Sequence, residues 1–406
     1  MKGSLDDLTT LSIINPANPR YNSQIGRVFD VLHYRMNLPR SSTASFEEHV
    51  ASATTFCFCL SNIFARNGDE VSAGLSEGFL HAWPAVWDIL EPVLLFSLTQ
   101  YALPAETRRL ARSAAAQVCG ALGRDDPTMT KMISTSGFNS FVLRMWSMEV
   151  EHPDYQLRDN EHWASMAAFL DRVFIVCGEE DEKHRLEQFI APMNGDMKSL
   201  ASTALKHLHH AFYRKRPNLD CVIWNIHIMT VLSDDCDSVR NAFLAQNSIA
   251  AVTKVLVAMT AQTPSPATAS LKAKAIRFLF WNLMLMIQST DGVTWIIQAL
   301  EAKLIFALLQ FEPWLPYMED DPAKFFYPFL DQILPNHTVY RSVLCRIERC
   351  LAKVQQMGLD SRKSQDTPLW NAWNSFVELA KAHIEILRLA PGGLLRAHER
   401  CHNAQV

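Results

Sequence analysis

The chain has 406 residues, of which 49% are hydrophobic and 20% are charged, and its formal net charge is -4. This length is large for one compact domain but natural for a continuous array of helical repeats. The charge is nearly balanced and no basic stripe is present, so nucleic-acid binding is not expected. Only 14 residues are glycine, and this scarcity favours helices over hairpins and phosphate-binding loops.

Cysteines and apolar segments predict a soluble, intracellular protein, cytoplasmic or nuclear. The nine cysteines are odd in number and scattered, as expected of free thiols in a reducing compartment. The N-terminal residues include Asp6 and Asp7 and lack an apolar stretch, so no signal peptide is expected. Phe278–Ile287 is too short to span a bilayer, and Phe79–Leu98 is interrupted by acidic residues and prolines, so no membrane association is expected.

In chain order, the sequence predicts three regions. Residues 1–44 are rich in Ser, Asn, Pro and Thr and form a loosely ordered lead-in with one short helix around 23–35. Residues 45–390 form a helical-repeat region that starts at the capping-box pair Ser45 and Glu48. Residues 391–406 form a C-terminal tail. We find no convincing strand, because apolar and polar residues nowhere alternate for long.

Apolar spacing and breaker residues place the helices of the central region. The predicted ranges are about 86–99, 106–122, 126–134, 137–148, 161–177, 183–191, 196–213, 218–232, 236–245, 248–261, 267–289, 291–300, 301–311, 336–356 and 367–389.

A recurring pattern predicts how these helices are arranged. An apolar pair, a small polar kink and an apolar helix recur before Phe138, Met197, Ile249 and, more loosely, Leu304. The successive separations of these four residues are 59, 52 and 55, longer than the roughly 40–47 residues of armadillo and HEAT repeats. The predicted fold class is therefore all-α, an irregular armadillo/HEAT-like α-solenoid whose units bury their apolar faces by stacking.

Residues 311–335 interrupt this rhythm with aromatic side chains, prolines and the acidic trio Glu319, Asp320 and Asp321. One interpretation is a long connection whose aromatic rings cover the helices. The other is a partner-binding surface, because exposed aromatic side chains beside carboxylates are unusual. The candidate residues of this surface are Trp314, Tyr317, Phe325, Phe326 and Tyr327.

Two patterns resemble catalytic or metal sites. Gly74–Gly78 matches the G-x-S-x-G elbow of hydrolases, with Ser76 as the nucleophile, but a loop rather than a strand precedes it. His207 and His210 share a helix face and could bind one metal, with His209 beside them, but a third ligand at matching spacing is missing. A structural interpretation is preferred for both, and no catalytic, cofactor-binding or metal-binding residue is predicted.

Other conspicuous residues have structural interpretations. The sulfurs of Cys57 and Cys59 lie about 200 degrees apart on a helix and cannot bind one zinc ion. The acidic run 179–182 precedes a predicted helix start, where carboxylates favour the helix dipole. Four tryptophans in apolar helical stretches are expected in the core: Trp163, Trp224, Trp281 and Trp295. Phosphate-loop, dinucleotide-binding and zinc-protease motifs do not occur.

The C-terminal residues carry a family resemblance. A Trp-rich last helix is followed by Cys401 and Asn403. This ending resembles uncharacterised fungal, chiefly basidiomycete, proteins in which a long helical region leads into a C-terminal MYND-type zinc finger that starts C-x-N-x-x-C. Val406 stands where the second cysteine belongs, and structural zinc needs four ligands. The finger is therefore expected to be absent or truncated, with zinc bound only if the sequence continued into a complete finger.

These observations predict a non-enzymatic helical-repeat scaffold for protein–protein interaction, with other proteins as partners. One alternative is the helical region of a MYND-type zinc-finger adaptor or transcriptional regulator, for which the resemblance implies binding of proline-rich peptides by the finger. A second alternative is an enzyme that uses Ser76 or the His207 and His210 pair.

Overall fold

The computed structural model describes residues 103–152, 165–176, 186–187, 189–193, 195–319, 321–359 and 367–389, with isolated positions between 50 and 91. Over these residues the chain is all-α, and no strand occurs in them. The chain divides into two compact units, Met1–Asp235 and Cys236–Val406, and this boundary lies within the predicted helical region 45–390. The predicted lead-in 1–44, its helix at 23–35 and the tail 391–406 lie outside the described residues.

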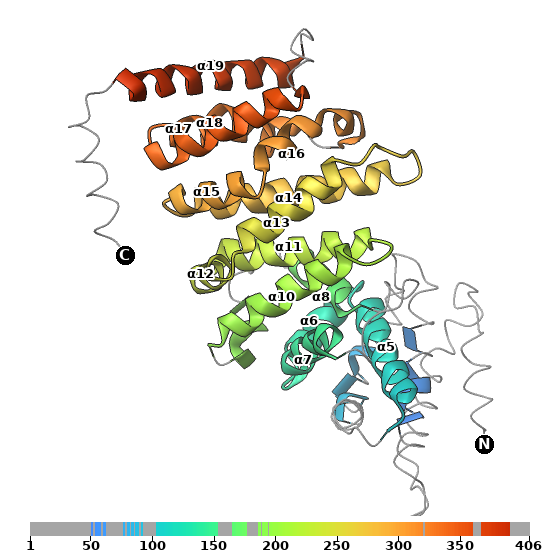
Figure 1. Ribbon diagram of the computed structural model, residues 1–406. Helices are drawn as coiled ribbons and strands as arrows, with labels where there is room; N and C mark the ends of the chain where they lie inside the picture. The colour runs from blue at the N-terminus through green and yellow to red at the C-terminus, as the bar shows by residue number, and fades with distance from the viewer. Residues whose placement is uncertain are drawn as a thin grey trace, which may run out of the picture. The chain divides into compact units, whose positions relative to one another are not determined.

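The described part of unit 1 consists of helices and one 3₁₀ turn (Figure 1). Its main described elements are α5 (Ala105–Leu122), α6 (Asp126–Ile133), α7 (Phe138–Glu151), α8 (Met166–Val176), the 3₁₀ turn η3 (Ala191–Met193), α10 (Met197–Phe212) and α11 (Leu219–Asp235). Helix α11 packs against α8 and α10, α5 packs against α8, and α7 packs against α10. The observed bounds follow the predicted ranges closely, because apolar spacing and capping residues are both local signals.

Local sequence explains where these helices begin. Asp125 caps α6 by accepting a hydrogen bond from the Thr128 amide at 3.0 Å, and Pro127 occupies the first turn. Asp196 caps α10 in the same way, accepting from the Ser199 amide at 2.9 Å. Each carboxylate satisfies an amide that the helix leaves without a partner and favours the positive end of the helix dipole.

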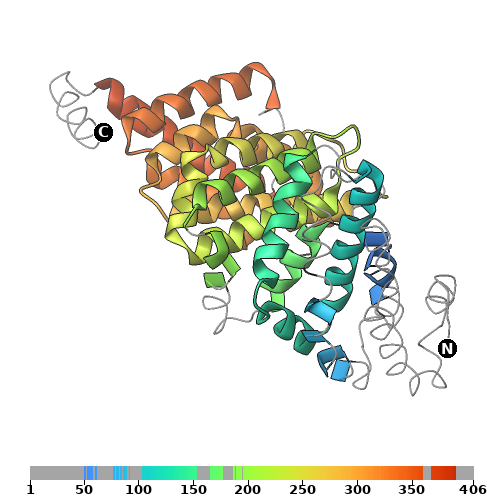
Figure 2. The same cartoon turned by 90° about the horizontal axis from the view of Figure 1, so that it is seen from below.

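Unit 2 has a second set of helices (Figures 1 and 2). Its described elements are α12 (Asp237–Ala245), α13 (Ser248–Thr260), α14 (Ala269–Gln288), α15 (Val293–Glu301), α16 (Leu304–Gln310), the 3₁₀ turns η4 (Glu312–Tyr317) and η5 (Pro322–Lys324), the π-helical turn η6 (Phe329–Ile333), α17 (Leu334–His337), α18 (Arg341–Gln356) and α19 (Pro368–Leu389). Helix α13 packs against α14, α15 and α16, while α18 packs against α15 and α19.

Four bends between helices share one backbone feature. The residue at each bend has a positive φ: 83° at Gly137, 82° at Gly195, 58° at Asn247 and 76° at Lys303. Three of them immediately precede α7, α13 and α16, and Gly195 stands one residue further from its helix, before the capping residue Asp196 of α10; these are the helices of the recurring sequence pattern. The α12–α13 and α15–α16 pairs bend by 71° and 64°. A left-handed residue breaks the helical path in one step, and glycine or asparagine adopts it most easily.

The described residues contain no single helix that is long and apolar enough to cross a membrane. The two bent pairs α12–α13 and α15–α16 reach that size and composition only when both helices are counted together.

The segment 311–335 covers α14 rather than crossing open surface. The rings of Phe311, Phe326 and Phe329 surround Phe280 of α14 at centroid distances of 5.3, 5.3 and 5.7 Å. The Trp314 indole N–H donates to the Thr260 carbonyl at 3.3 Å. Prolines divide the segment into short helical turns, which lets several aromatic rings face one helix.

Candidate functional site

Three of the five residues predicted for a partner-binding surface are in the core. Trp314, Phe325 and Phe326 have exposed fractions of 0%, 1% and 0%, so they are not available to a partner. Tyr317 is 36% exposed and Tyr327 is half-buried. The prediction is wrong for the three buried rings, because α14 offers an apolar face that their local sequence could not reveal.

The predicted core tryptophans also differ from expectation. Trp281 on α14 is 44% exposed, so its assignment to the core is wrong, and Trp224 and Trp295 are half-buried. Trp163, Cys59 and the acidic run 179–182 lie outside the described residues, whereas Cys57 is buried.

Ser76 belongs to a helical segment, and its hydroxyl is hydrogen-bonded to the residue that caps α6. Its hydroxyl donates to Oδ2 of Asp125 at 2.7 Å, and that same oxygen accepts from the Thr128 amide at the start of α6. A hydrolase elbow needs a strand that delivers the serine into a sharp turn, but Ser76 and Glu77 are both helical. The Ser76 hydroxyl therefore connects its helix to the cap of α6.

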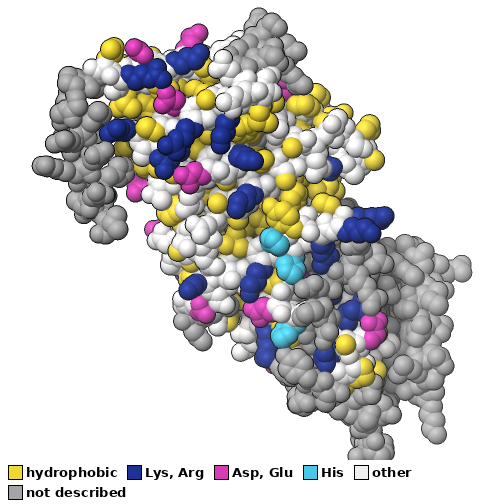
Figure 3. Space-filling model, in the orientation of Figure 1, with side chains coloured by type: hydrophobic (Ala, Val, Ile, Leu, Met, Phe, Trp, Pro, Cys, Tyr) yellow, Lys and Arg dark blue, Asp and Glu magenta, His cyan; other side chains and the backbone are white. Residues whose placement is uncertain are grey.

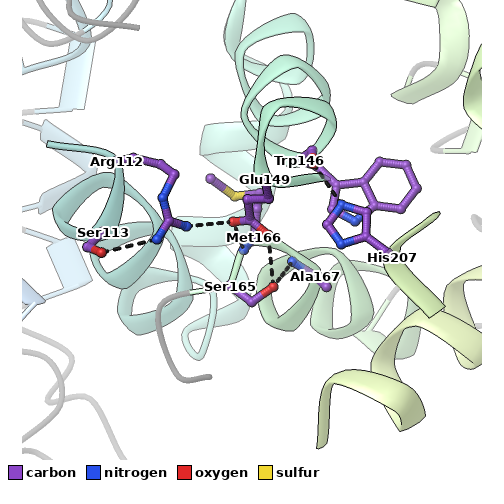
Figure 4. Close-up of polar contacts among 8 residues, drawn as sticks. All are labelled: Arg112, Ser113, Trp146, Glu149, Ser165, Met166, Ala167 and His207. Carbon is purple, nitrogen blue, oxygen red and sulfur yellow. Dashed lines mark hydrogen bonds and ion pairs between the residues drawn. The ribbon is translucent and has the colours of Figure 1, made fainter. Parts of the chain in front are cut away.

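His207 is buried against Trp146 (Figure 4). The two rings are stacked with centroids 4.8 Å apart and planes 6° apart. Nε2 of His207 lies 2.7 Å from the Trp146 carbonyl oxygen, and a carbonyl can only accept, so Nε2 carries the proton and donates. Burial lowers the pKa of His207 to about 3 despite this bond. The ring is therefore neutral near pH 7.

Nε2 of His207 is not available to a metal shared with His210, because it is already used by the Trp146 carbonyl. In the part of the chain that the structure describes, no group of three or more His, Cys, Asp or Glu side chains is placed to hold a metal ion.

A buried ion pair lies near His207, one turn along α7 from Trp146 (Figure 4). Nη1 of Arg112 is 3.0 Å from Oε1 of Glu149, and both side chains are almost fully buried. Glu149 also accepts from the Met166 amide at 2.8 Å and the Ser165 hydroxyl at 3.0 Å. The Ser165 hydroxyl in turn accepts from the Ala167 amide at 3.2 Å. The carboxylate thus joins α5 and α7 to the start of α8.

Burial raises the pKa of Glu149, while Arg112, the Met166 amide and the Ser165 hydroxyl act in the opposite direction. The cavity beside this cluster has a volume of about 20 Å³, which is room for little more than one water molecule. With its polar groups turned toward one another and no space for a substrate, the cluster is structural. This cluster was not predicted from the sequence, because Arg112 and Glu149 are 37 positions apart and belong to no motif.

Two surface grooves of similar size lie among the described residues of unit 2. The first, with a volume of about 480 Å³, lies between α18 and α19. Its charges are compensated, because Arg388 lies 2.6 Å from a Glu348 oxygen and 3.8 Å from a Glu385 oxygen. This groove offers a partner little unbalanced charge.

The second groove, with a volume of about 510 Å³, lies between α18 and the helices α13 and α16; we call it the α13/α16/α18 groove. Its base includes Leu300, Phe306 and Cys350, which are all buried. The Cys350 thiol faces the Leu300 carbonyl at 3.8 Å and links α18 to α15. Burial raises the pKa of this thiol, so it is protonated near pH 7.

The charged residues of this groove are mostly cations. Lys303, Arg346, Arg349 and Lys353 line it, and Glu301 is the one carboxylate among its described lining residues. Glu301 pairs with Arg346 at 3.4 Å. Within the described ranges, no ion pair involves Lys303, Arg349 or Lys353. Figure 3 shows Lys and Arg side chains gathered, with apolar side chains between them, over the part of unit 2 that holds α15, α16 and α18.

Comparison with known proteins identifies no relative: no protein family, curated protein or solved structure matches the chain. The residues that carry the MYND resemblance, Cys401 and Asn403, lie outside the described residues. That resemblance therefore stays a prediction.

Proposed function

We propose that this protein is a non-enzymatic helical-repeat scaffold that binds other proteins through the α13/α16/α18 groove. The observation that carries the proposal is the combination of an apolar base with three cations that no carboxylate pairs among the described residues. Solvated single cations are ordinary surface features, but cations that surround one apolar depression resemble the polar rim and apolar centre of a protein interface.

The repeat architecture is part of the same proposal. The four left-handed bends at Gly137, Gly195, Asn247 and Lys303 support a set of structural repeats, each with a bend that leads into a helix. We propose that these repeats form an irregular armadillo/HEAT-like solenoid, in which stacking buries the apolar face of each repeat. Free thiols at Cys119, Cys221, Cys236, Cys345 and Cys350 support an intracellular location.

The internal contacts of the chemically conspicuous residues support a role without catalysis. The Ser76 hydroxyl is held by the carboxylate that caps α6, and His207 is neutral and bonded to a backbone carbonyl. The Asp125 oxygen that contacts Ser76 also accepts from the Thr128 amide, and among the described residues no histidine is hydrogen-bonded to Ser76 as the base of a hydrolase triad would be.

A comparison of captured proteins tests this function. The tagged full chain, an Arg349→Glu/Lys353→Glu variant and a Lys131→Glu/Lys274→Glu variant are each used to capture proteins from cells that make the chain, and bound proteins are quantified by mass spectrometry. Lys131 and Lys274 are exposed and outside the groove, so the control carries the same change in charge. We expect the groove variant to lose specific proteins that the control retains. Identical sets for all three chains would contradict the proposal.

A further inference from the structure

We propose that the α13/α16/α18 groove binds an acidic segment of a partner protein, with an apolar side chain of that segment inserted between the cations. This inference rests on the proposed function and names the chemistry of the partner. It follows from the charge, the lining and the backbone conformation of the groove.

Charge is the first argument. The groove has four cations and one carboxylate, whereas the whole chain has a net charge of -4. The local excess of positive charge therefore opposes the overall balance. Complementary potentials steer association and select partners. A segment with several carboxylates would pair Lys303, Arg349 and Lys353 without displacing the existing Arg346–Glu301 contact.

The arrangement on α18 makes this charge directional. Arg346, Arg349 and Lys353 are spaced three and four positions apart, so they follow one face of the helix. Lys303 comes from the α15–α16 bend. The groove thus has a row of cations on α18 and one further cation on another element, an arrangement that fits carboxylates spread along a chain.

Lys303 supplies an independent argument. Its φ of 76° is left-handed, a conformation that costs a non-glycine residue free energy. Gly137 and Gly195 occupy the corresponding bends before α7 and α10, and asparagine, which tolerates this conformation better than most residues, occupies the bend before α13. The lysine at this bend therefore carries a backbone cost that glycine would avoid, and its side chain lines the groove. Residues in strained conformations concentrate at binding sites.

The apolar lining defines the rest of the partner. Leu300 and Phe306 form part of the base, and Met357, which is 61% exposed, lies at the end of α18. Methionine adapts its shape to an apolar side chain. The Gln310 amide also lines the groove, and its Oε1 has no hydrogen-bond partner among the described residues. An amide can bond to the backbone of an inserted peptide.

The same features favour a peptide over a nucleic acid. Single-stranded nucleic acids bind where exposed aromatic rings stack on bases along a positive track. Phe306 is the single aromatic residue of the groove and is 6% exposed, so it presents no face for stacking. An acidic peptide needs carboxylates and one apolar group, and the groove has complementary features for both.

Peptide binding to the full chain tests the inference. The probes are fluorescein-labelled peptides of sequence EEEFLEEE, QQQFLQQQ and EEEGGEEE, and binding is followed by fluorescence anisotropy. We expect EEEFLEEE to bind and both others to bind at least about tenfold more weakly, because each lacks one of the two required features. Raising the salt from about 0.1 M to about 1 M shortens the Debye length from about 10 to about 3 Å, so binding of EEEFLEEE should weaken.

The backbone at Lys303 allows a matched pair of variants. Lys303→Gly removes the cation and relieves the left-handed conformation, so the fold is retained. Asn247→Gly makes the corresponding backbone change at the α12–α13 bend, outside the groove. We expect Lys303→Gly to weaken EEEFLEEE binding by about threefold, as for one partly exposed ion pair, and Asn247→Gly to leave it unchanged. Arg349→Glu/Lys353→Glu should weaken it by at least about tenfold.

Three results would overturn the inference. The first is equal affinity of the chain for EEEFLEEE and QQQFLQQQ. The second is an affinity for EEEFLEEE that neither Lys303→Gly nor the double variant changes. The third is tighter binding of a labelled oligouridylate than of EEEFLEEE to the same groove. Loss of captured proteins by the double variant, combined with any of these results, would leave the proposed function standing while the acidic partner is rejected. Unchanged capture would reject the proposed function itself.

Discussion

Arg112 and Glu149 form a buried ion pair in unit 1. Both side chains are almost fully buried, and three donors surround the carboxylate. Removal of one charge from such a pair leaves the other without compensation, which is more costly than removal of both. The pair therefore gives a sharp test of how unit 1 is held together.

Glu149→Gln should lower the free energy of unfolding of unit 1 by about 3 kcal/mol, because the Arg112 charge stays buried without its partner. The glutamine oxygen can still accept from the Met166 amide, so the start of α8 is preserved. Urea unfolding followed by circular dichroism measures the change. Adding Arg112→Met should restore part of the lost stability, since the uncompensated charge is gone. A double variant less stable than Glu149→Gln would refute this account of the ion pair.

His207 predicts a dependence of stability on pH. Burial lowers its folded-state pKa to about 3, and an unperturbed histidine has a pKa of about 6.5. Between these two values the unfolded chain binds a proton that the folded chain does not, so stability falls as the pH is lowered below about 6.5. For this residue alone the loss reaches about 1.4 kcal/mol at about pH 5.5.

The difference between the wild type and a variant isolates this contribution. His207→Gln should reduce the acid dependence of the unfolding free energy, measured by urea titrations from about pH 5 to about pH 7.5. His210→Gln is the matched control: desolvation lowers the pKa of His210 as well, but its side chain is half-exposed, so its effect should be smaller. Identical pH profiles for the wild type and His207→Gln would show that His207 is not held neutral.

At the scale of elements, much of the helical pattern was predictable from sequence. The ends of α6 and α10 follow from Asp125 and Asp196, because capping is a contact between neighbours in the chain. The recurring kink before Phe138 and Leu304 likewise corresponds to left-handed residues.

Contacts between distant residues were not predictable in the same way. The burial of Trp314 and the exposure of Trp281 depend on which helix faces each ring, and one sequence contains no direct signal for that choice. The α13/α16/α18 groove shows the same limit. The spacing of Arg346, Arg349 and Lys353 is visible in the sequence, but the opposite wall is formed by residues about forty to ninety positions earlier.

Two glycine substitutions in unit 1, one at the bend before α7 and one within α5, should change the stability in opposite directions. Gly137 has a φ of 83°, and an added Cβ would lie 2.3 Å from a Glu91 carboxylate oxygen, so Gly137→Ala should destabilise by about 1–2 kcal/mol. Gly120 lies within α5 with no atom within 4 Å of an added Cβ. Gly120→Ala should therefore stabilise by about 0.5–1 kcal/mol. Thermal unfolding compares the two variants, and shifts of the same sign would contradict the assigned backbone roles.

At the scale of the whole molecule, each unit has its own buried core. Trp146, Phe138 and Leu208 belong to the core of unit 1, and Phe280, Ile347 and Trp370 to that of unit 2. Separate cores can unfold in separate steps. Cysteines in both units make the steps measurable, because the thiolate reacts with alkylating reagents and the thiol does not.

We expect the two units to lose protection of their cysteines at different urea concentrations. Burial raises the pKa of Cys221 to about 12 and also raises the pKa values of Cys119 and Cys350, so all three are unreactive thiols when folded at about pH 8. Unfolding returns each pKa to about 8.5 and exposes the sulfur. Pulses of iodoacetamide at increasing urea, read by peptide mass spectrometry, report on unit 1 through Cys119 and Cys221 and on unit 2 through Cys350.

Glu149→Gln should shift the urea midpoints of Cys119 and Cys221 alkylation to lower concentration and leave the midpoint of Cys350 alkylation unchanged. An equal shift at all three cysteines would show that the chain unfolds as one cooperative body, because a single transition moves every probe together.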